Sequence, residues 1–253
     1  MADWQPDQAR ATGRRSIRVC ESMSMILGHG TERFLVFLPG FLISPESYRG
    51  LFAGISGSDL TVVVPRLYRR GPRVMLGRFT VDDEARRAVE VVRQRAKTDV
   101  KIWLGGHSRG GQAAWLADRL LAERGTSMEG LILVDPVDGS GPRSAELHAT
   151  KTTADFEHRP LIMGAELGGK CAPTALNHDQ FARAAGSSWH LVIEDMGHAD
   201  IMTGHALSFG RRLCAGGADP DQSRMLVRSL VQDYLSGVID SAWSPPPGAR
   251  WAG

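Results

Sequence analysis

A serine between glycines carries the strongest chemical signal in this sequence. Ser108 stands in the run Gly106-His-Ser-Arg-Gly110, directly after the apolar residues Ile102 to Leu104. A serine on a sharp turn between a buried strand and a helix exposes its hydroxyl for attack on a carbonyl carbon. Such a turn requires small residues two positions before and two after the serine, and the two glycines meet this requirement. We therefore predict that Ser108 is a nucleophile and that the adjacent His107 is a supporting residue.

A serine nucleophile needs a general base to remove its proton, and this protein has eight histidines from which to choose. In hydrolases with this order of elements the base lies on a loop after the last strands of the sheet. His198 follows the apolar run 189–193, and Gly197 permits the turn that would bring the imidazole over the serine. We therefore predict that His198 is the base, with His205 on the same loop as a reserve candidate. His178 and His190 are interpreted as structural.

The acid that orients the base is expected at the carboxyl end of a sheet strand. Asp135 directly follows the apolar run Leu131 to Val134, which makes it the favoured candidate. Asp138 is a nearby alternative that could instead be a structural turn residue. Glu166 is a rival, because it follows the next apolar run, where many hydrolases of this type carry their acid. The residues alone leave this choice open.

Acyl transfer also needs hydrogen-bond donors for the oxyanion, and losing one such donor typically raises the barrier by about 2.7 to 4 kcal/mol. We predict the backbone N–H of Arg109, at the positive end of the helix that follows the serine. The second predicted donor is the N–H of Phe41, in a loop where Pro39-Gly40 ends an earlier apolar strand. Leu42, Ile43, Glu166 and His205 are the candidate residues of a substrate pocket.

The surrounding pattern predicts an α/β fold with a mostly parallel central sheet flanked by helices. Short, continuously apolar runs of this kind suit strands that are covered on both faces. The predicted strands are Phe34–Leu38, Leu60–Val64, Val100–Leu104, Leu131–Val134, Leu161–Met163 and Trp189–Ile193. The predicted helices are Val81–Lys97, Arg109–Arg124 and Pro220–Leu235, with caps at Thr80 and Asp219 and a glycine stop at Gly125.

The length of 253 residues fits one large core, so we expect a single domain over residues 16–243. Residues 1–15 and 244–253 are predicted to be mobile tails, because the first is polar and the second carries a proline run that ends a helix. Residues 135–160 could form a small lid or substrate loop, with a short helix around Ser144 to His148 as an equal possibility. No large cap domain fits.

Composition excludes several classes of protein. The net charge is only +2, with 30 basic and 28 acidic residues, which argues against a nucleic-acid partner. No apolar stretch approaches the roughly 20 residues of a membrane span, and the first residues lack an apolar signal core, so we expect a cytoplasmic protein. The three cysteines, Cys20, Cys171 and Cys214, are odd in number and widely spaced, which predicts reduced structural thiols. No metal or cofactor is expected, and the oligomeric state is not predicted.

Several blocks together resemble the chlorophyllase family over residues 33–200. These are Gly106–Gly111, Leu133–Gly139, Cys171-Ala-Pro173, Asn177-His178 with Phe181, Trp189-His190 and Asp195–Asp200, in the same order as in the family. The resemblance implies an α/β-hydrolase fold in which Ser108 is the nucleophile, Asp135 the acid and His198 the base. It also implies hydrolysis of the phytyl ester of chlorophyll through an acyl-enzyme, without a metal or an organic cofactor.

Two segments depart from the family pattern. Glu166 lies in a glycine-rich segment where no acid is expected, and the run 201–205 lacks the acidic residues that follow the family histidine. Only four of the basic residues are lysines, a composition that suits a bacterial member. We therefore expect a serine hydrolase for a bulky hydrophobic carboxylic ester, or an enzyme that transfers its acyl group. The alternative hypothesis is a hydrolase-fold protein that binds or cyclises a hydrophobic small molecule without acylation.

Overall fold

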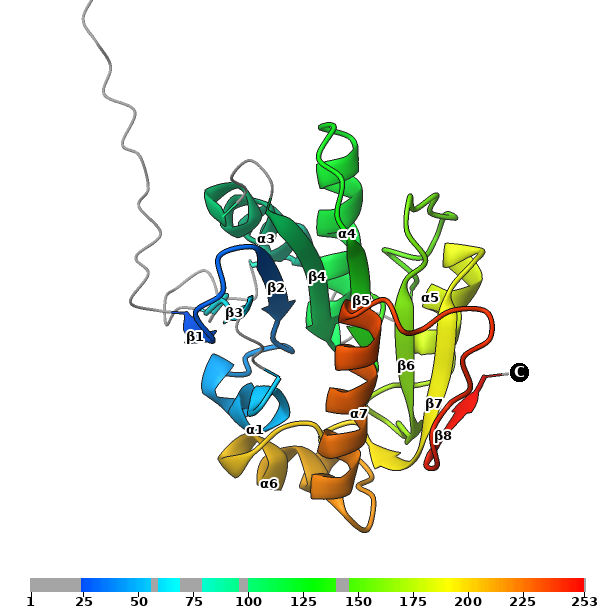
Figure 1. Cartoon of the computed structure of the whole chain (residues 1–253). Helices are drawn as coiled ribbons and strands as arrows, with labels where there is room; N and C mark the ends of the chain where they lie inside the picture. Colours follow the sequence, from blue (N-terminus) through cyan, green and yellow to red (C-terminus); the bar gives the residue numbers. More distant parts are fainter. Residues whose placement is uncertain (1–23, 56–58, 69–78, 96–99, 140–145, 253) are drawn as a thin grey trace, which may run out of the picture.

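A computed structural model describes residues 24–252 apart from 56–58, 69–78, 96–99 and 140–145. Its centre is an eight-stranded sheet with the order β1-β3-β2-β4-β5-β6-β7-β8 (Figure 1). The strands are β1 (Met25–Leu27), β2 (Arg33–Leu38), β3 (Leu60–Val64), β4 (Lys101–His107), β5 (Gly130–Val134), β6 (Leu161–Leu167), β7 (Trp189–Gly197) and β8 (Ala249–Trp251). The six predicted strands are all present, and five of them, all except β3, extend beyond the predicted bounds.

The six central strands are parallel, and only the two edge strands run antiparallel. From β3 through β2, β4, β5 and β6 to β7 each neighbouring pair is parallel. β1 pairs with β3 and β8 pairs with β7 in the opposite sense. The carboxyl ends of the six central strands therefore meet at one edge, where loops can bring side chains from distant parts of the sequence together. This is the mostly parallel sheet that the apolar runs predict.

Helices cover both faces of the sheet (Figure 1). One face carries α3 (Val81–Arg95), α4 (Arg109–Ala122) and α5 (His178–Ala185), and the other carries α1 (Arg49–Phe52), α6 (Gly204–Leu213) and α7 (Pro220–Leu235). A short 3-10 helix, η2 (Pro45–Tyr48), precedes α1. Each face has its own hydrophobic cluster, in which apolar helix side chains pack against alternate residues of the strands. Two-sided coverage explains why the strands are apolar without interruption.

The predicted helix ends are supported by their caps. The Asp219 side chain accepts hydrogen bonds from the N–H groups of Asp221 and Gln222 at 2.9 and 3.1 Å, and α7 has its predicted bounds. At the start of α3 the Thr80 hydroxyl accepts from the N–H of Asp83, whose carboxylate accepts from the N–H of Thr80 in return. After α4, Gly125 has a φ of +70°, which suits its predicted role as a stop.

The end of the chain differs from the prediction. Residues 249–251 form β8, so a mobile tail is the wrong description for this part of 244–253. The preceding helix, α7, ends at Leu235, before the proline run is reached, and the residues that follow the run pair with β7. Trp251 packs near Trp189 and Trp243, with ring centres 6.0 and 5.6 Å away. The predicted tail over 1–15 lies outside the described residues.

A buried carboxylate organises the described part of the long loop after β5. Asp138 accepts hydrogen bonds from the N–H groups of His148, Ala149 and Thr150, from the Thr150 hydroxyl and from the side chain of Gln112. Residues 146–160 contain no helix, so residues 146–148 do not form the predicted short helix, and the first two residues of that prediction lie outside the described residues. Asp138 thus has the structural role that the sequence left open for it, and a lid function stays a prediction.

The cysteines contradict the expectation of reduced thiols. Cys171 and Cys214 form a disulfide across a sequence separation of 43 residues, and Cys20 lies outside the described residues. Spacing could not reveal this pair, because the fold alone brings the loop after β6 to the end of α6. Disulfides persist mainly in oxidising compartments, so this bond counts against the predicted cytoplasmic location. In the part of the chain that the structure describes, no helix has the length and apolarity to cross a membrane.

Candidate active site

Ser108 occupies the sharp turn between β4 and α4 that its neighbours predict. Its backbone has a φ of 55° and a ψ of −128°, a combination that a residue with a side chain rarely adopts. A Cβ atom added at Gly106 would lie 2.2 Å from the carbonyl oxygen of Gly110, and one at Gly110 would lie 2.2 Å from that of Leu38. Only glycine fits at either position, so both residues are required for this turn.

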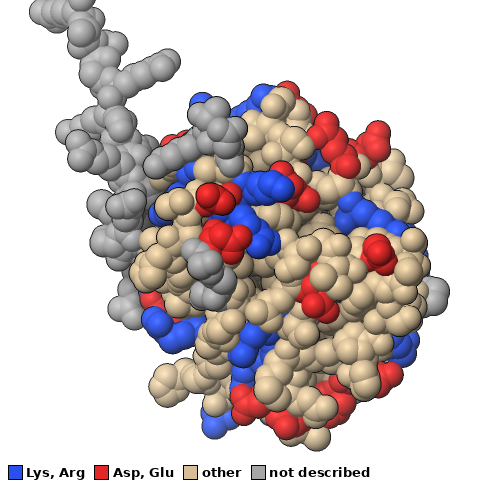
Figure 2. All heavy atoms as spheres, in the orientation of Figure 1, with Lys and Arg blue, Asp and Glu red and all other residues tan. Residues whose placement is uncertain are grey.

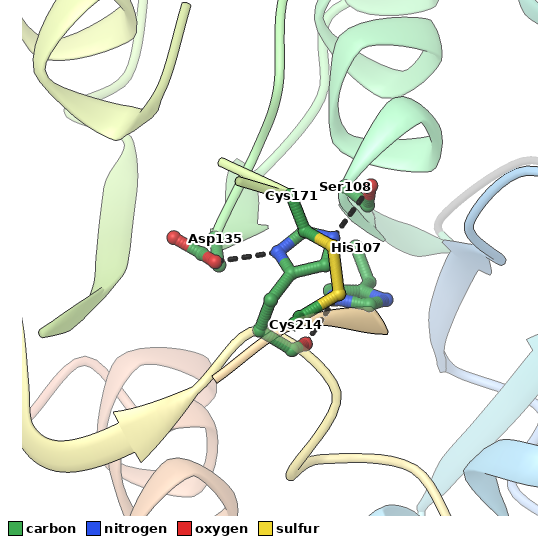
Figure 3. The surroundings of a disulfide bond; sticks show 6 residues. His107, Ser108, Asp135, Cys171 and Cys214 are labelled. Carbon is green, nitrogen blue, oxygen red and sulfur yellow. Dashed lines mark hydrogen bonds and ion pairs between the residues drawn. A yellow bond between two sulfur atoms is a disulfide. The ribbon is translucent and has the colours of Figure 1, made fainter. Parts of the chain in front are cut away.

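One imidazole connects the serine hydroxyl with a carboxylate. His198 Nε2 lies 2.9 Å from Ser108 Oγ, and His198 Nδ1 lies 2.6 Å from Asp135 Oδ2. Figure 3 shows these two hydrogen bonds as dashed lines. Since a carboxylate only accepts, Nδ1 carries the hydrogen and Nε2 can accept the proton of the hydroxyl. The structure thus brings together the three residues that the sequence selects.

Asp135 is held in place as a charged acceptor. It is 1% exposed, and its second oxygen, Oδ1, accepts a hydrogen bond of 3.0 Å from the N–H of Ala165 on β6. Burial alone would raise the pKa of this carboxyl, but the hydrogen bonds from His198 and the Ala165 N–H lower the pKa below its ordinary value. Asp135 is therefore ionised at neutral pH and stabilises both the orientation and the protonated form of the imidazole.

The alternatives for acid and base lie outside this chain of hydrogen bonds. Glu166 is exposed; it accepts from the N–H of Asp195 at 3.0 Å and pairs with Arg250 at 3.5 Å. His205 is exposed on the first turn of α6. Asp138 faces residues 148–150, as described above. The geometry therefore distinguishes Asp135 from Glu166, a choice that spacing left open.

Positive backbone φ angles gather at this edge of the sheet. Among the described residues, the non-glycine positions with positive φ are Leu42, Ser108, Asp135 and Asp195. The first three follow β2, β4 and β5 respectively, and Asp195 lies within the last three residues of β7. Such conformations cost of order 1–3 kcal/mol each and persist where the surrounding structure enforces them, typically at functional sites. Backbone strain therefore points to the same region as the side chains.

A buried carboxylate shapes the turn that carries His198. Asp200 Oδ2 accepts hydrogen bonds from the N–H groups of Gly197 and Gly217 at 2.8 and 2.7 Å. Arg224 donates to the carbonyl oxygens of Asp200 and Met202, which fixes the far side of the same turn. The sequence did not identify Asp200 as part of the site, because its role depends on a segment 17 residues away.

A second series of hydrogen bonds reaches the backbone of His198. The N–H of Gly40 donates to the hydroxyl oxygen of Tyr48 at 2.9 Å, and Tyr48 lies 2.8 Å from His107 Nδ1. His107 Nε2 lies 2.9 Å from the carbonyl oxygen of His198. Because that oxygen only accepts, Nε2 donates and Nδ1 accepts from the Tyr48 hydroxyl, so every bond has a defined direction. Burial lowers the pKa of His107 to about 3, which keeps it neutral.

This second series gives His107 the supporting role predicted for it and adds Tyr48, which the sequence analysis missed. Tyr48 is fully buried and lies 59 residues before its partner. No local pattern marks it, since its importance rests on a contact that only the fold creates. These hydrogen bonds link the N–H of Gly40, the residue before the predicted oxyanion donor Phe41, to the backbone carbonyl of His198.

The loop that carries the predicted donor Phe41 is braced by Arg109. The guanidinium centre of Arg109 lies 5.0 Å from the centre of the Phe41 ring, and its Nε donates to Glu84 at 2.7 Å. Glu84 is fully buried, and burial raises its pKa to about 7 although the pairing with Arg109 opposes this. The N–H of Arg109, the first residue of α4, has no partner within the helix, as an oxyanion donor requires.

Apolar side chains stand at the same loop. Phe41 and Leu42 are 37% and 56% exposed, and Ile43 is half-buried against the core. The Tyr68 ring meets that of Phe41 edge-on, with centres 5.5 Å apart. Exposed large apolar groups beside a candidate nucleophile provide a surface for a hydrophobic substrate.

Two further features of the region are the charges on the surface and the position of the disulfide. On the face that Figure 2 shows, basic and acidic side chains are interspersed among uncharged ones. This pattern agrees with the balanced composition of the sequence. The disulfide Cys171–Cys214 lies in the region of Ser108, His107 and Asp135 (Figure 3). It joins the loop after β6 to the end of α6, the helix that follows the His198 turn.

Comparison with known proteins gives matches to one family. The model of the family described as Chlorophyllase matches residues 22–244. The chain is 27% identical over 246 residues to Chlorophyllase-2 of Arabidopsis thaliana, covering 83% of this chain and 74% of the relative. It is also 27% identical over 239 residues to the chloroplastic Chlorophyllase-1 of Citrus unshiu, covering 83% of this chain and 70% of the relative.

Solved structures with the same architecture include hydrolases of low sequence identity. Esterase 2 of Thermogutta terrifontis superposes with a TM-score of 0.59 at 18% identity, covering 85% of this chain and 89% of the esterase. A structure from a study of two metagenome-derived lipolytic enzymes, LipS and LipT, gives a TM-score of 0.58 at 16% identity, covering 85% and 98%. At such identities the likeness concerns the fold alone, and it confirms the predicted α/β-hydrolase fold.

Proposed function

The chain belongs to the chlorophyllase family and is a carboxylic-ester hydrolase, and from this premise we propose that it cleaves a bulky hydrophobic ester through an acyl-enzyme on Ser108. One observation carries the proposal: the unbroken hydrogen-bonded chain from the Ser108 hydroxyl through His198 to the buried Asp135. A charged carboxylate, a correctly oriented imidazole and a strained serine turn together suit nucleophilic catalysis.

Each proposed step is assigned to a named group of the protein. His198 Nε2 takes the proton of Ser108 as Oγ bonds to the carbonyl carbon, and the carbonyl oxygen becomes an oxyanion. The N–H groups of Phe41 and Arg109 stabilise that charge. His198 then gives the proton to the departing alkoxide, which leaves as the alcohol. A water molecule repeats the sequence on the acyl-enzyme, which releases the acid and restores the serine.

The substrate class follows from the family and from the apolar loop. The relatives are named chlorophyllases, so the phytyl ester of chlorophyll is one candidate. The exposed Phe41 and Leu42 beside Ser108 favour a bulky apolar substrate in any case. Glu166 and His205 are proposed only as outer borders of the pocket, because both are exposed and outside the hydrogen-bonded chain. Thioester cleavage and acyl transfer would use the same groups.

The test is turnover of a substrate panel by the wild type and by Ser108→Ala. The panel contains aryl esters of short and long acyl chains, a long-chain acyl thioester and chlorophyll. We expect faster turnover of the long-chain ester than of the short one, and a loss of at least ~10⁴-fold in Ser108→Ala. Ser208→Ala, which changes an exposed serine of α6, is the matched control and should retain full activity. If Ser108→Ala still converts a substrate of the panel at the wild-type rate, the result would instead support binding or cyclisation without acylation.

A further inference from the structure

Three possible metal ligands converge away from the serine. His178 Nδ1 lies 2.7 Å from His190 Nε2, and Asp179 Oδ1 lies 3.3 Å from the first nitrogen and 3.8 Å from the second. In the described part of the chain, this is the group of histidine, cysteine and carboxylate side chains whose ligand atoms all lie close enough to share one ion. From the sequence, both histidines are expected to be structural and no metal is expected.

The separations of these atoms match the size of a transition-metal ion. Zinc binds imidazole nitrogen and carboxylate oxygen at about 2.0–2.2 Å, so tetrahedral ligands lie about 3.3 Å from one another. The observed distances of 2.7, 3.3 and 3.8 Å bracket that value. We propose that His178, Asp179 and His190 bind one divalent transition-metal ion of the zinc type, at a site separate from the hydrolytic centre.

The fold holds these ligands in place without a metal. Asn177 caps α5 by accepting a hydrogen bond from the N–H of Asp179, which fixes the first turn that carries two of the ligands. The His178 ring lies directly on β6, where a Cβ atom at Gly164 would come within 2.2 Å of it. His190 lies on β7, in register with Ile162 of β6. Ordering these side chains on folding lowers the entropic cost of binding an ion.

The chemical types of the ligands suit the ion. Imidazole nitrogen and carboxylate oxygen are both ligands that zinc accepts. One carboxylate adds a negative charge. Two imidazoles favour zinc and its neighbours over calcium or magnesium, which prefer oxygen ligands.

The site is open on one side. His178 and Asp179 line a groove together with Asn177, Glu166 and Arg250, which gives an ion access and leaves its fourth position for water. A bound ion would join α5 to β7 across β6. β6 also supplies Ala165, whose N–H holds the carboxylate of Asp135. The expected role is therefore to stabilise this side of the sheet rather than to take part in ester cleavage.

The experiment titrates the chelator-treated full-length protein with Zn²⁺ by calorimetry and with Co²⁺ by visible absorption. We expect one saturable site, Co²⁺ bands of four-coordinate intensity, and an unfolding temperature that rises with Zn²⁺ concentration as mass action requires. His190→Gln should weaken Zn²⁺ binding at least ~100-fold and abolish the Co²⁺ bands. Asp179→Asn, which preserves shape, should weaken binding in the same direction and serves as the second variant if His190→Gln folds poorly.

His205→Gln is the matched control, since it removes an exposed histidine outside the cluster and should bind Zn²⁺ like the wild type. The proposal is overturned if the wild type shows no saturable site, or if both His190→Gln and Asp179→Asn bind with wild-type affinity. None of these readouts depends on turnover, so the result is independent of the proposed hydrolase function.

Discussion

At the scale of single residues, the direction of each hydrogen bond decides what the site can do. Asp135 accepts from His198 Nδ1, which leaves Nε2 free to accept the Ser108 proton. Asp135 keeps its charge because its hydrogen bonds outweigh the effect of burial on its pKa. In the second series of hydrogen bonds, the Tyr48 hydroxyl donates to His107 Nδ1, and His107 Nε2 donates to the carbonyl oxygen of His198. Substitutions that preserve shape but alter these roles therefore test the account most sharply.

The first such substitution is Asp135→Asn. An amide in place of the carboxylate can donate to Nδ1 and so favours the wrong tautomer of His198, and we expect kcat to fall by about 10⁴-fold with little change in KM. Steady-state kinetics on a long-chain ester measure the effect. Glu166→Gln, the same chemical change at the rival acid, should leave kcat within about twofold. An equal loss in both variants would contradict the assignment of the acid.

The second is Tyr48→Phe, which removes the hydroxyl between Gly40 and His107 while keeping the ring. Two buried polar atoms lose their partner, which should lower the free energy of unfolding by about 1–3 kcal/mol. Since Gly40 adjoins Phe41, the proposed oxyanion donor, kcat should fall about tenfold or more, with a smaller change in KM. Kinetics and urea unfolding on the same preparation measure both effects. A loss of stability with unchanged kcat would show that Tyr48 supports the fold but does not position the site.

At this scale the sequence predicts those site residues that are marked by their immediate neighbours. Ser108 is marked by its glycines and His198 by Gly197, both within two residues of the group concerned. The residues alone left the choice between Asp135 and Glu166 open because both follow apolar strands. The family resemblance favours Asp135, and the distance to His198 agrees with it. Tyr48 carries no local signature, since its partner lies 59 residues further along the chain.

At the scale of elements, the site is assembled by the carboxyl ends of parallel strands. β2, β4, β5 and β7 each end in a turn that supplies one part: Phe41, Ser108, Asp135 and His198 respectively. The last turn is unusual in depending on a buried carboxylate, Asp200, that ties it to the segment after α6. Activity should therefore depend on residues that never touch the substrate.

Asp200→Asn tests this dependence. The amide can occupy the same space, but it is a weaker acceptor for the N–H groups of Gly197 and Gly217, and it loses the charge that faces Arg211. We expect the free energy of unfolding to fall by about 1–3 kcal/mol and kcat to fall at least tenfold. Urea unfolding and ester kinetics measure these changes. Asp155→Asn, an exposed position, is the control, and indistinguishable results for the two variants would refute the role of Asp200.

The elements themselves were predicted to different degrees. Long amphipathic or continuously apolar segments with caps, such as α7, were predicted with their bounds because the signal is local. The edge strands β1 and β8 have three residues each, and their existence depends on pairing with a distant strand. α6 is short, has no fully buried residue and contains Gly204 and Gly210, and glycine within a segment disfavours the prediction of a helix.

At the scale of the whole molecule, the disulfide and the buried histidines set the conditions under which the fold is stable. Cys171 and Cys214 join the loop after β6 to the end of α6. His107 is neutral and fully enclosed, in contact with both His198 and Tyr48. Redox state and pH should therefore affect stability through identifiable groups.

Reduction of the disulfide should lower stability substantially. For a closed loop of 43 residues the chain-entropy relation gives about 4 kcal/mol. Urea unfolding with and without a dithiol reductant measures the effect. The double variant Cys171→Ser, Cys214→Ser should start at the lower stability and show no response to the reductant. A wild-type protein that is equally insensitive would contradict the presence of the bond.

Stability should also fall with decreasing pH through His107. Its pKa is about 3 in the folded protein, against about 6.5 for an exposed histidine, so between these values the unfolded chain binds a proton that the folded chain does not. Its contribution is complete above pH 6.5 and declines by up to about 1.4 kcal/mol per pH unit below it. Urea unfolding at several pH values between 7.5 and 4.5 should give a steeper decline for the wild type than for His107→Gln. Parallel curves would exclude His107 as the source.

The central claim is that Ser108 is the nucleophile, and covalent labelling tests it most directly. The native protein is treated with a fluorophosphonate ester, and the modified residue is located by mass spectrometry of the digested protein. The account predicts one phosphonyl group per chain, on Ser108, with labelling abolished in Ser108→Ala and retained in Ser208→Ala. Labelling of Ser108→Ala at the wild-type rate, or an adduct on another residue of the native protein, would contradict it.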